Sequence, residues 1–71
     1  MSTYLNIARW ARRAGRKVRI TGRDGIGYTG MVDYFFEAKD NTEPGCGICI
    51  DCDGWCGRYF NENDILSIEV A

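Results

Sequence analysis

The sequence predicts a mainly β domain over residues 1–71, with one N-terminal α-helix and five short strands that form a small barrel. Three observations support this fold class. The first segment carries apolar residues at helical spacing. From Lys17 onward, apolar and polar residues alternate in short runs between turn-forming residues. At 71 residues the chain forms a single domain with a modest core, and barrel closure lets five short strands bury one face and hide their edges.

The helix is expected over residues 3–14. Ser2 or Thr3 can cap its start, and Gly15 can adopt the left-handed conformation that ends it. At about 100° per residue, one side is expected to face the core, and it is formed by Tyr4, Ile7, Trp10, Ala11 and Ala14. With this orientation, Trp10 anchors the helix on the barrel, whereas Leu5 falls on the opposite, basic side.

Five strands are expected to follow, over residues 17–22, 28–37, 47–52, 55–60 and 65–70. The first strand alternates in KVRIT and the last in ILSIEV. The aromatic cluster at residues 34–36 breaks alternation, as expected for a strand that curls so that both faces meet the core. Asp53-Gly54 predicts a two-residue turn between the third and fourth strands. This turn would place Cys49 opposite Arg58.

The run VRITGRDGIGYTGMVDYF resembles the first motif of Sm-like proteins, in which alternating apolar residues precede an Asp-Gly or Asn-Gly turn and a second strand. The matching positions are Val18, Ile20, Asp24, Gly25, Tyr28, Gly30 and Val32. The ending GRYFNENDILSIEV resembles the last two strands of Sm-like and SH3-like barrels, and the element order is similar to that of Rof-type inhibitors of the termination factor Rho.

This resemblance implies a five-stranded Sm-like or SH3-like small barrel, with assembly into a homo-oligomer through the fourth and fifth strands. One motif departs from the family pattern. FNENDI stands where the second Sm motif has an Arg-Gly or Lys-His pair. Because that pair carries much of the uridine recognition in Sm rings, their base-binding pocket is not carried over to this chain.

Charge is segregated along the chain, although the net charge is only −1. Residues 1–23 carry +7 and residues 24–71 carry −8. The candidate nucleic-acid-binding residues are the seven cations of the first segment: Arg9, Arg12, Arg13, Arg16, Lys17, Arg19 and Arg23. Arg9, Arg12, Arg13 and Arg16 follow one stripe at helical spacing without an acid to neutralise them, and arginine suits phosphate groups. The alternative interpretation of the stripe is a solvated helix face.

Four cysteines have the spacing C-x2-C-x2-C-x3-C, which resembles the iron–sulfur run of bacterial ferredoxins. The alternative metal site, for zinc or an iron–sulfur cluster, would use Cys46, Cys49, Cys52 and Cys56. In the predicted hairpin, however, Cys52 lies on one side of the sheet and Cys49 and Cys56 on the other. Since one ion cannot collect ligands from both faces, we expect free thiols and no cofactor.

Composition argues against catalysis, because the chain has no histidine, its carboxylates are scattered and no glycine run has a phosphate-loop pattern. It has no 18-residue apolar run and no signal-peptide pattern, so we expect no membrane partner and a cytoplasmic location. We expect a non-catalytic module that binds RNA or DNA through the helix and first strand. The alternatives are a small regulator or phage-type inhibitor that docks on a larger protein, and a zinc or iron–sulfur mini-domain. The candidates for base stacking are Trp55, Tyr59, Tyr34 and Phe35, although most of them are expected in the core.

Overall fold

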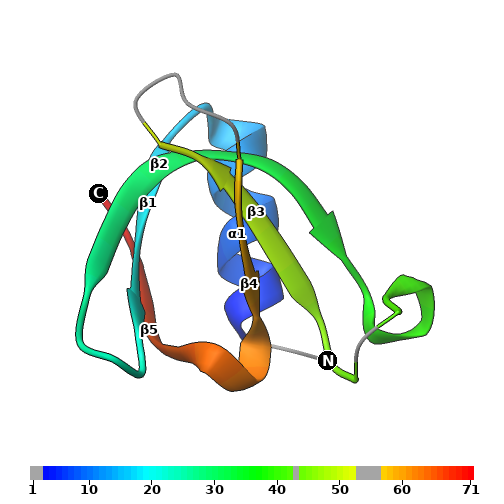
Figure 1. The fold of residues 1–71 in the computed structure, drawn as a ribbon. Helices are drawn as coiled ribbons and strands as arrows, with labels where there is room; N and C mark the ends of the chain where they lie inside the picture. Colours follow the sequence, from blue (N-terminus) through cyan, green and yellow to red (C-terminus); the bar gives the residue numbers. More distant parts are fainter. Residues whose placement is uncertain (1–2, 43, 53–56) are drawn as a thin grey trace.

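The computed structural model describes residues 3–42, 44–52 and 57–71. Its elements in chain order are α1 (Thr3–Ala14), β1 (Lys17–Gly22), β2 (Gly27–Phe36), η1 (Ala38–Asp40), β3 (Gly47–Asp51), β4 (Arg58–Asn61), η2 (Glu62–Asp64) and β5 (Ile65–Val70), where η marks a short 3-10 helix (Figure 1). The mainly β class with one N-terminal helix and five strands is therefore confirmed. The predicted Asp53-Gly54 turn and the first two residues of the predicted fourth strand, Trp55 and Cys56, lie outside the described residues.

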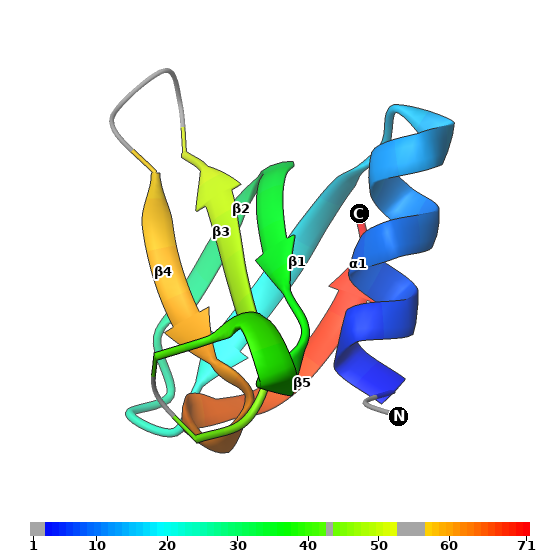
Figure 2. The same cartoon turned by 90° about the vertical axis from the view of Figure 1, so that its right-hand side faces the viewer.

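The five strands form one antiparallel sheet in the order β4-β3-β2-β1-β5. The predicted barrel closure is wrong, because β4 and β5 are the two edges of this sheet and η2 joins them without strand pairing. Helix α1 packs against β2, β5, β1 and β3, so it covers apolar surface that a closed barrel would bury with its own strands (Figure 2). β4 has four residues, so it offers few backbone groups that could pair with a further strand.

The core lies between α1 and the inner face of the sheet, which is the face toward the helix. Its buried residues are Leu5, Ala8, Ala11, Val18, Ile20, Val32, Cys46, Ile48, Ile50, Phe60, Ile65 and Ile68. Asn61 is the buried polar residue among those described, and its side chain is well paired. Its Nδ2 donates to the Pro44 carbonyl at 2.8 Å, and its Oδ1 accepts from the Asn63 amide at 2.9 Å. Asn61 thereby caps η2 and fixes the connection between the two edge strands.

The buried side of α1 differs from the predicted one. Leu5, Ala8 and Ala11 are buried, whereas Trp10 is 54% exposed and Ala14 is exposed. Ala11 is buried as predicted, and Tyr4 and Ile7 are partly buried against the core, so the buried side keeps three of its five predicted residues and is shifted toward Leu5 and Ala8. Small alanines next to Leu5 let the helix backbone approach the sheet closely, and a tryptophan at the same place would hold it away. Trp10 is therefore not the anchor of the helix.

The register between β3 and β4 is displaced by one residue from the predicted one. Cys49 lies opposite Tyr59 rather than Arg58, and Ile48 lies opposite Phe60. The observed register places the wholly apolar ring of Phe60 in the core with Ile48, and it leaves the polar hydroxyl of Tyr59 on the outer face. A second irregularity, a shift between Val32 and Tyr34, turns the aromatic end of β2 relative to its first half.

Candidate nucleic-acid interface

Three helical arginines surround one aromatic ring at the end of β2. Arg9, Arg12 and Arg13 line a surface hollow together with Phe35. The guanidinium carbons of Arg9 and Arg12 lie 5.4 and 5.7 Å from the centroid of the Phe35 ring, within cation–π range. Phe35 is half-buried and packs against the core on its other side. We call these four residues the arginine surface.

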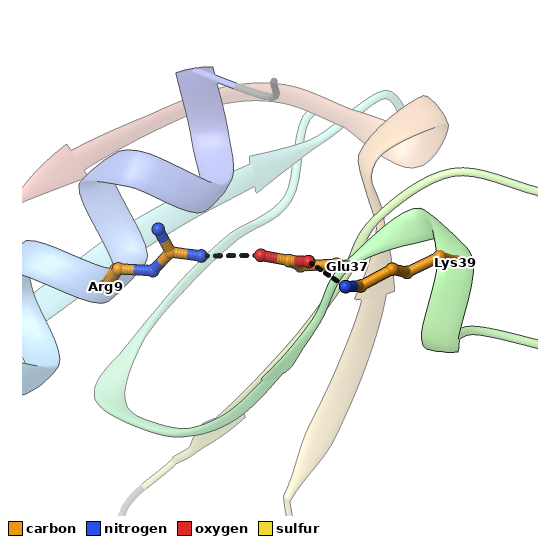
Figure 3. A network of polar contacts seen from close by, with 3 residues as sticks. All are labelled: Arg9, Glu37 and Lys39. Atoms are coloured by element: carbon orange, nitrogen blue, oxygen red, sulfur yellow. Dashed lines mark hydrogen bonds and ion pairs between the residues drawn. The ribbon is translucent and has the colours of Figure 1, made fainter.

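Glu37 holds one of these arginines in place (Figure 3). Its Oε1 lies 3.1 Å from Arg9 Nη2, and its Oε2 lies 3.7 Å from Lys39 Nζ. Because the Arg9 and Glu37 side chains are 37% and 46% exposed, water screens this pair and its contribution to stability is small. Arg12 and Arg13 have no ion pair within the described residues, so the arginine surface with Glu37 and Lys39 keeps a charge of +3.

The other four predicted cations lie elsewhere, so the structure brings together three of the seven. Arg16 Nη2 donates to the Ala71 carbonyl at 3.1 Å, and the Lys17 carbonyl accepts from the Ala71 amide at 2.9 Å. Arg19 is exposed on the outer face of β1, opposite Glu69 of β5. Arg23 Nε donates to the Asn63 carbonyl at 2.8 Å, beyond the other end of β1.

A cation that sequence reasoning left in the acidic half has a distinct position. The Arg58 guanidinium carbon lies 4.3 Å from the centroid of the Tyr28 ring, and that ring lies 5.5 Å from the ring of Phe60. Arg58, Tyr28 and Phe60 line a hollow that also contains Arg23 and two acidic residues, Asp24 and Asp64. Two cations and two carboxylates give this hollow a mixed charge, whereas the charged residues that line the arginine surface are all arginines. No sequence signal indicated this position of Arg58, because the predicted register placed Arg58 opposite Cys49, whereas the structure pairs it with Ile50.

The candidate stacking residues are divided between the two faces of the sheet. Tyr34 and Tyr59 lie on the outer face and are 62% and 38% exposed, whereas Phe35 belongs to the inner side. Trp55 lies outside the described residues. Of the four, Phe35 is the ring that the arginines surround.

Three of the four cysteines lie within the described residues, and they occupy different environments. Cys46 is buried, Cys52 packs against the core, and Cys49 lies on the outer face between Tyr34 and Tyr59. Burial raises the pKa of Cys46, with the Glu62 carboxylate as the next cause, and burial followed by the charge of Asp33 raises the pKa of Cys49.

Within the described ranges, no three side chains of the ligand types histidine, cysteine, aspartate or glutamate gather as a metal site would require. Cys56, the fourth residue of the alternative metal site, falls outside those ranges.

Comparisons with protein-family models, with curated proteins and with solved structures gave no match. The resemblance to Sm-like and SH3-like barrels therefore rests on the sequence motifs, while the structure supports the coarser description of an open antiparallel sheet with one helix. In the part of the chain that the structure describes, no helix has both the length and the apolarity needed to cross a membrane.

Proposed function

We propose that this chain is a non-catalytic binding module with a Sm-like or SH3-like arrangement of strands, and that its arginine surface binds single-stranded RNA or DNA. The observation that carries the proposal is the grouping of Arg9, Arg12 and Arg13 around the half-buried ring of Phe35, with a local charge of +3. This grouping offers the two features that single-strand binding uses, namely cations for the phosphates and flat groups on which a base can stack.

The three arginines have different roles in this proposal. Arg12 and Arg13 have no ion pair within the described residues, and each can take a phosphate with two parallel hydrogen bonds. Arg9, fixed between Glu37 and the Phe35 ring, presents a preorganised guanidinium plane to a base. Because phosphate contacts dominate, binding is expected to be weakly selective for sequence and sensitive to salt.

The test is a titration of a labelled single-stranded oligouridylate, followed by fluorescence anisotropy at several salt concentrations. With about three phosphates neutralised, the logarithm of the association constant should fall with the logarithm of salt concentration with a slope of about −2. The double variant Arg12→Ser/Arg13→Ser should bind at least tenfold more weakly and with a shallower slope, because it loses two phosphate contacts.

Two further variants separate the arginine surface from general basicity. Arg19→Ser removes one positive charge on the outer face, and its affinity should stay close to that of the parent. Phe35→Leu keeps an apolar side chain against the core but removes the ring, so it should lower affinity without changing the salt slope. The proposal is wrong if oligouridylate does not bind at low salt, or if Arg19→Ser weakens binding as much per charge removed as the double variant does.

A further inference from the structure

The outer face of the sheet carries a second hollow that shares no residue with the arginine surface. It is lined by Phe36, Asp40, Asn41, Thr42, Cys49 and Tyr59. These residues come from β2, β3, β4 and the segment after β2. We call it the outer hollow.

Strand pairing gathers exposed aromatic rings at the outer hollow. Cys49 of β3 lies opposite Tyr34 of β2 and opposite Tyr59 of β4, so one tyrosine flanks it on each side. Phe36 lies two residues beyond Tyr34 on the same face of β2 and is 36% exposed. Three large rings on adjacent strands thus point away from the core, where the hydrophobic effect alone would not place them.

The ring of Tyr59 is held in one position. The ring lies so close above Gly47 that a Cβ atom added to Gly47 would be 2.5 Å from Cε1 of Tyr59. Its hydroxyl accepts a hydrogen bond of 2.8 Å from Asn41 Nδ2 and one of 3.5 Å from Nδ2 of the buried Asn61. Asn41 Nδ2 also donates to the Gly45 carbonyl at 2.9 Å. A ring fixed in this way loses little conformational entropy when a ligand binds to it.

The charge of the outer hollow is opposite to that of the arginine surface. The acidic residue Asp40 lines the hollow, and none of the described residues that line it is a cation. Asp33 is close enough to Cys49 to raise the pKa of that thiol further, after burial. Lys39, the neighbour of Asp40 in η1, instead pairs with Glu37 at 3.7 Å. A phosphate would be repelled here, whereas a cation would meet both a carboxylate and the faces of aromatic rings.

We propose that the outer hollow binds a lysine or arginine side chain of a protein partner, with the adjoining partner segment lying over Tyr34. The cation would lie between Asp40 and the rings of Phe36 and Tyr59. The outer hollow would thus give this module a protein-docking surface on the side of the sheet opposite to the arginine surface.

The test is an NMR titration of the isotope-labelled full chain with three blocked tripeptides that differ only in the central residue. These are acetyl-Gly-Arg-Gly-amide, its neutral isostere with citrulline, and its acidic counterpart with glutamate. The arginine peptide should shift the backbone amides of Asp40, Asn41, Cys49 and Tyr59 with a Kd of about 1 mM. The citrulline peptide should bind at least fivefold more weakly, and the glutamate peptide should cause no saturable shift.

Matched variants locate the binding site. Asp40→Asn should weaken arginine-peptide binding at least threefold, while Asp64→Asn, the same change of charge in η2, should leave it unchanged. Arg12→Ser/Arg13→Ser should also leave it unchanged, so failure of this proposal is distinguishable from failure of the nucleic-acid proposal. The inference is overturned if the arginine peptide causes no saturable shift, if citrulline binds equally well, if the two aspartate variants behave alike, or if oligouridylate shifts the same four amides.

Discussion

Gly47→Ala is expected to destabilise the domain, although alanine normally suits a strand better than glycine. Gly47 is not among the glycines with positive φ, so alanine brings no backbone strain of its own. The new Cβ would lie 2.5 Å from Cε1 and 2.8 Å from Oη of Tyr59, both closer than atoms in contact can be. The tyrosine ring must therefore move away from β3.

The magnitude follows from three opposing contributions. Overpacking of this kind costs about 1–3 kcal/mol, and moving the ring also weakens the hydrogen bond from Asn41 Nδ2, which is worth about 0.5–1.5 kcal/mol. Replacing glycine by alanine within a strand contributes about 0.5–1 kcal/mol in the opposite direction. The net loss should be about 0.5–4 kcal/mol. When Tyr59 is alanine, the first two contributions disappear, and Gly47→Ala should stabilise by about 0.5–1 kcal/mol.

The measurement is urea unfolding of the parent, Gly47→Ala, Tyr59→Ala and the double variant. The expected coupling energy is about 1.5–4.5 kcal/mol, well above the error of about 0.5 kcal/mol within which independent substitutions add. In thermal unfolding, each kcal/mol corresponds to about 4–8 °C for a domain of this size. If Gly47→Ala changes stability by the same amount with and without the tyrosine ring, Tyr59 is not held above Gly47 and the preorganisation argued for the outer hollow fails.

Three further predictions concern the core and the cysteines. Leu5→Ala should lower the free energy of unfolding, measured in urea, by about 2–5 kcal/mol. This loss should exceed that of Trp10→Ala, because Leu5 is 1% exposed and Trp10 is 54% exposed. If Trp10→Ala were the more destabilising change, the helix orientation predicted from sequence would be favoured. Since the pKa of Cys49 is raised in the folded state, its contribution to stability is present below the unfolded thiol pKa of about 8.5 and is lost as pH rises toward the folded value. Stability measured between pH 7 and 10 should therefore fall less steeply for Cys49→Ser than for the parent, and equal slopes would contradict the shift. Cys46 is buried and Cys49 lies on the outer face, so these two thiols are on different sides of the sheet. A strong chelator should therefore leave the Tm unchanged. A lower Tm in the presence of the chelator, together with zinc in the purified protein, would restore the metal hypothesis.

The helix shows what periodicity can and cannot predict. Its range was predictable because the cap, the apolar spacing and Gly15 are all local signals. The rotation of the helix about its axis was not predictable, since alanines occur on both candidate sides and the large aromatic side chain of Trp10 favoured the wrong side. The advantage of Ala8 and Ala11 is a close approach to the sheet, and that advantage exists only once the sheet is present.

The sheet shows the same division between local and distant signals. Alternation was sufficient to locate β1 and β5 at their observed ranges. The register of β4 depends on whether Phe60 or Tyr59 enters the core, which a turn dipeptide does not specify. Closure depends on pairing between β4 and β5, and these strands are separated in the sheet by the other three. The arginine stripe was likewise visible in the helical spacing, but the ring of Phe35 beneath it and the Arg9–Glu37 pair, 28 residues apart, are products of tertiary packing.

Segregation of charge along the sequence does not become segregation in space, because antiparallel strands bring the two halves together. Arg19 of the basic segment lies opposite Glu69 of the acidic one, and Arg9 is paired with Glu37. The contrast that survives folding is produced instead by strand alternation at the end of β2. Phe35 turns toward the helix and its arginines, while its neighbour Phe36 turns to the outer face and the carboxylate of Asp40. A single step along the chain thus separates a surface suited to phosphates from one suited to cations.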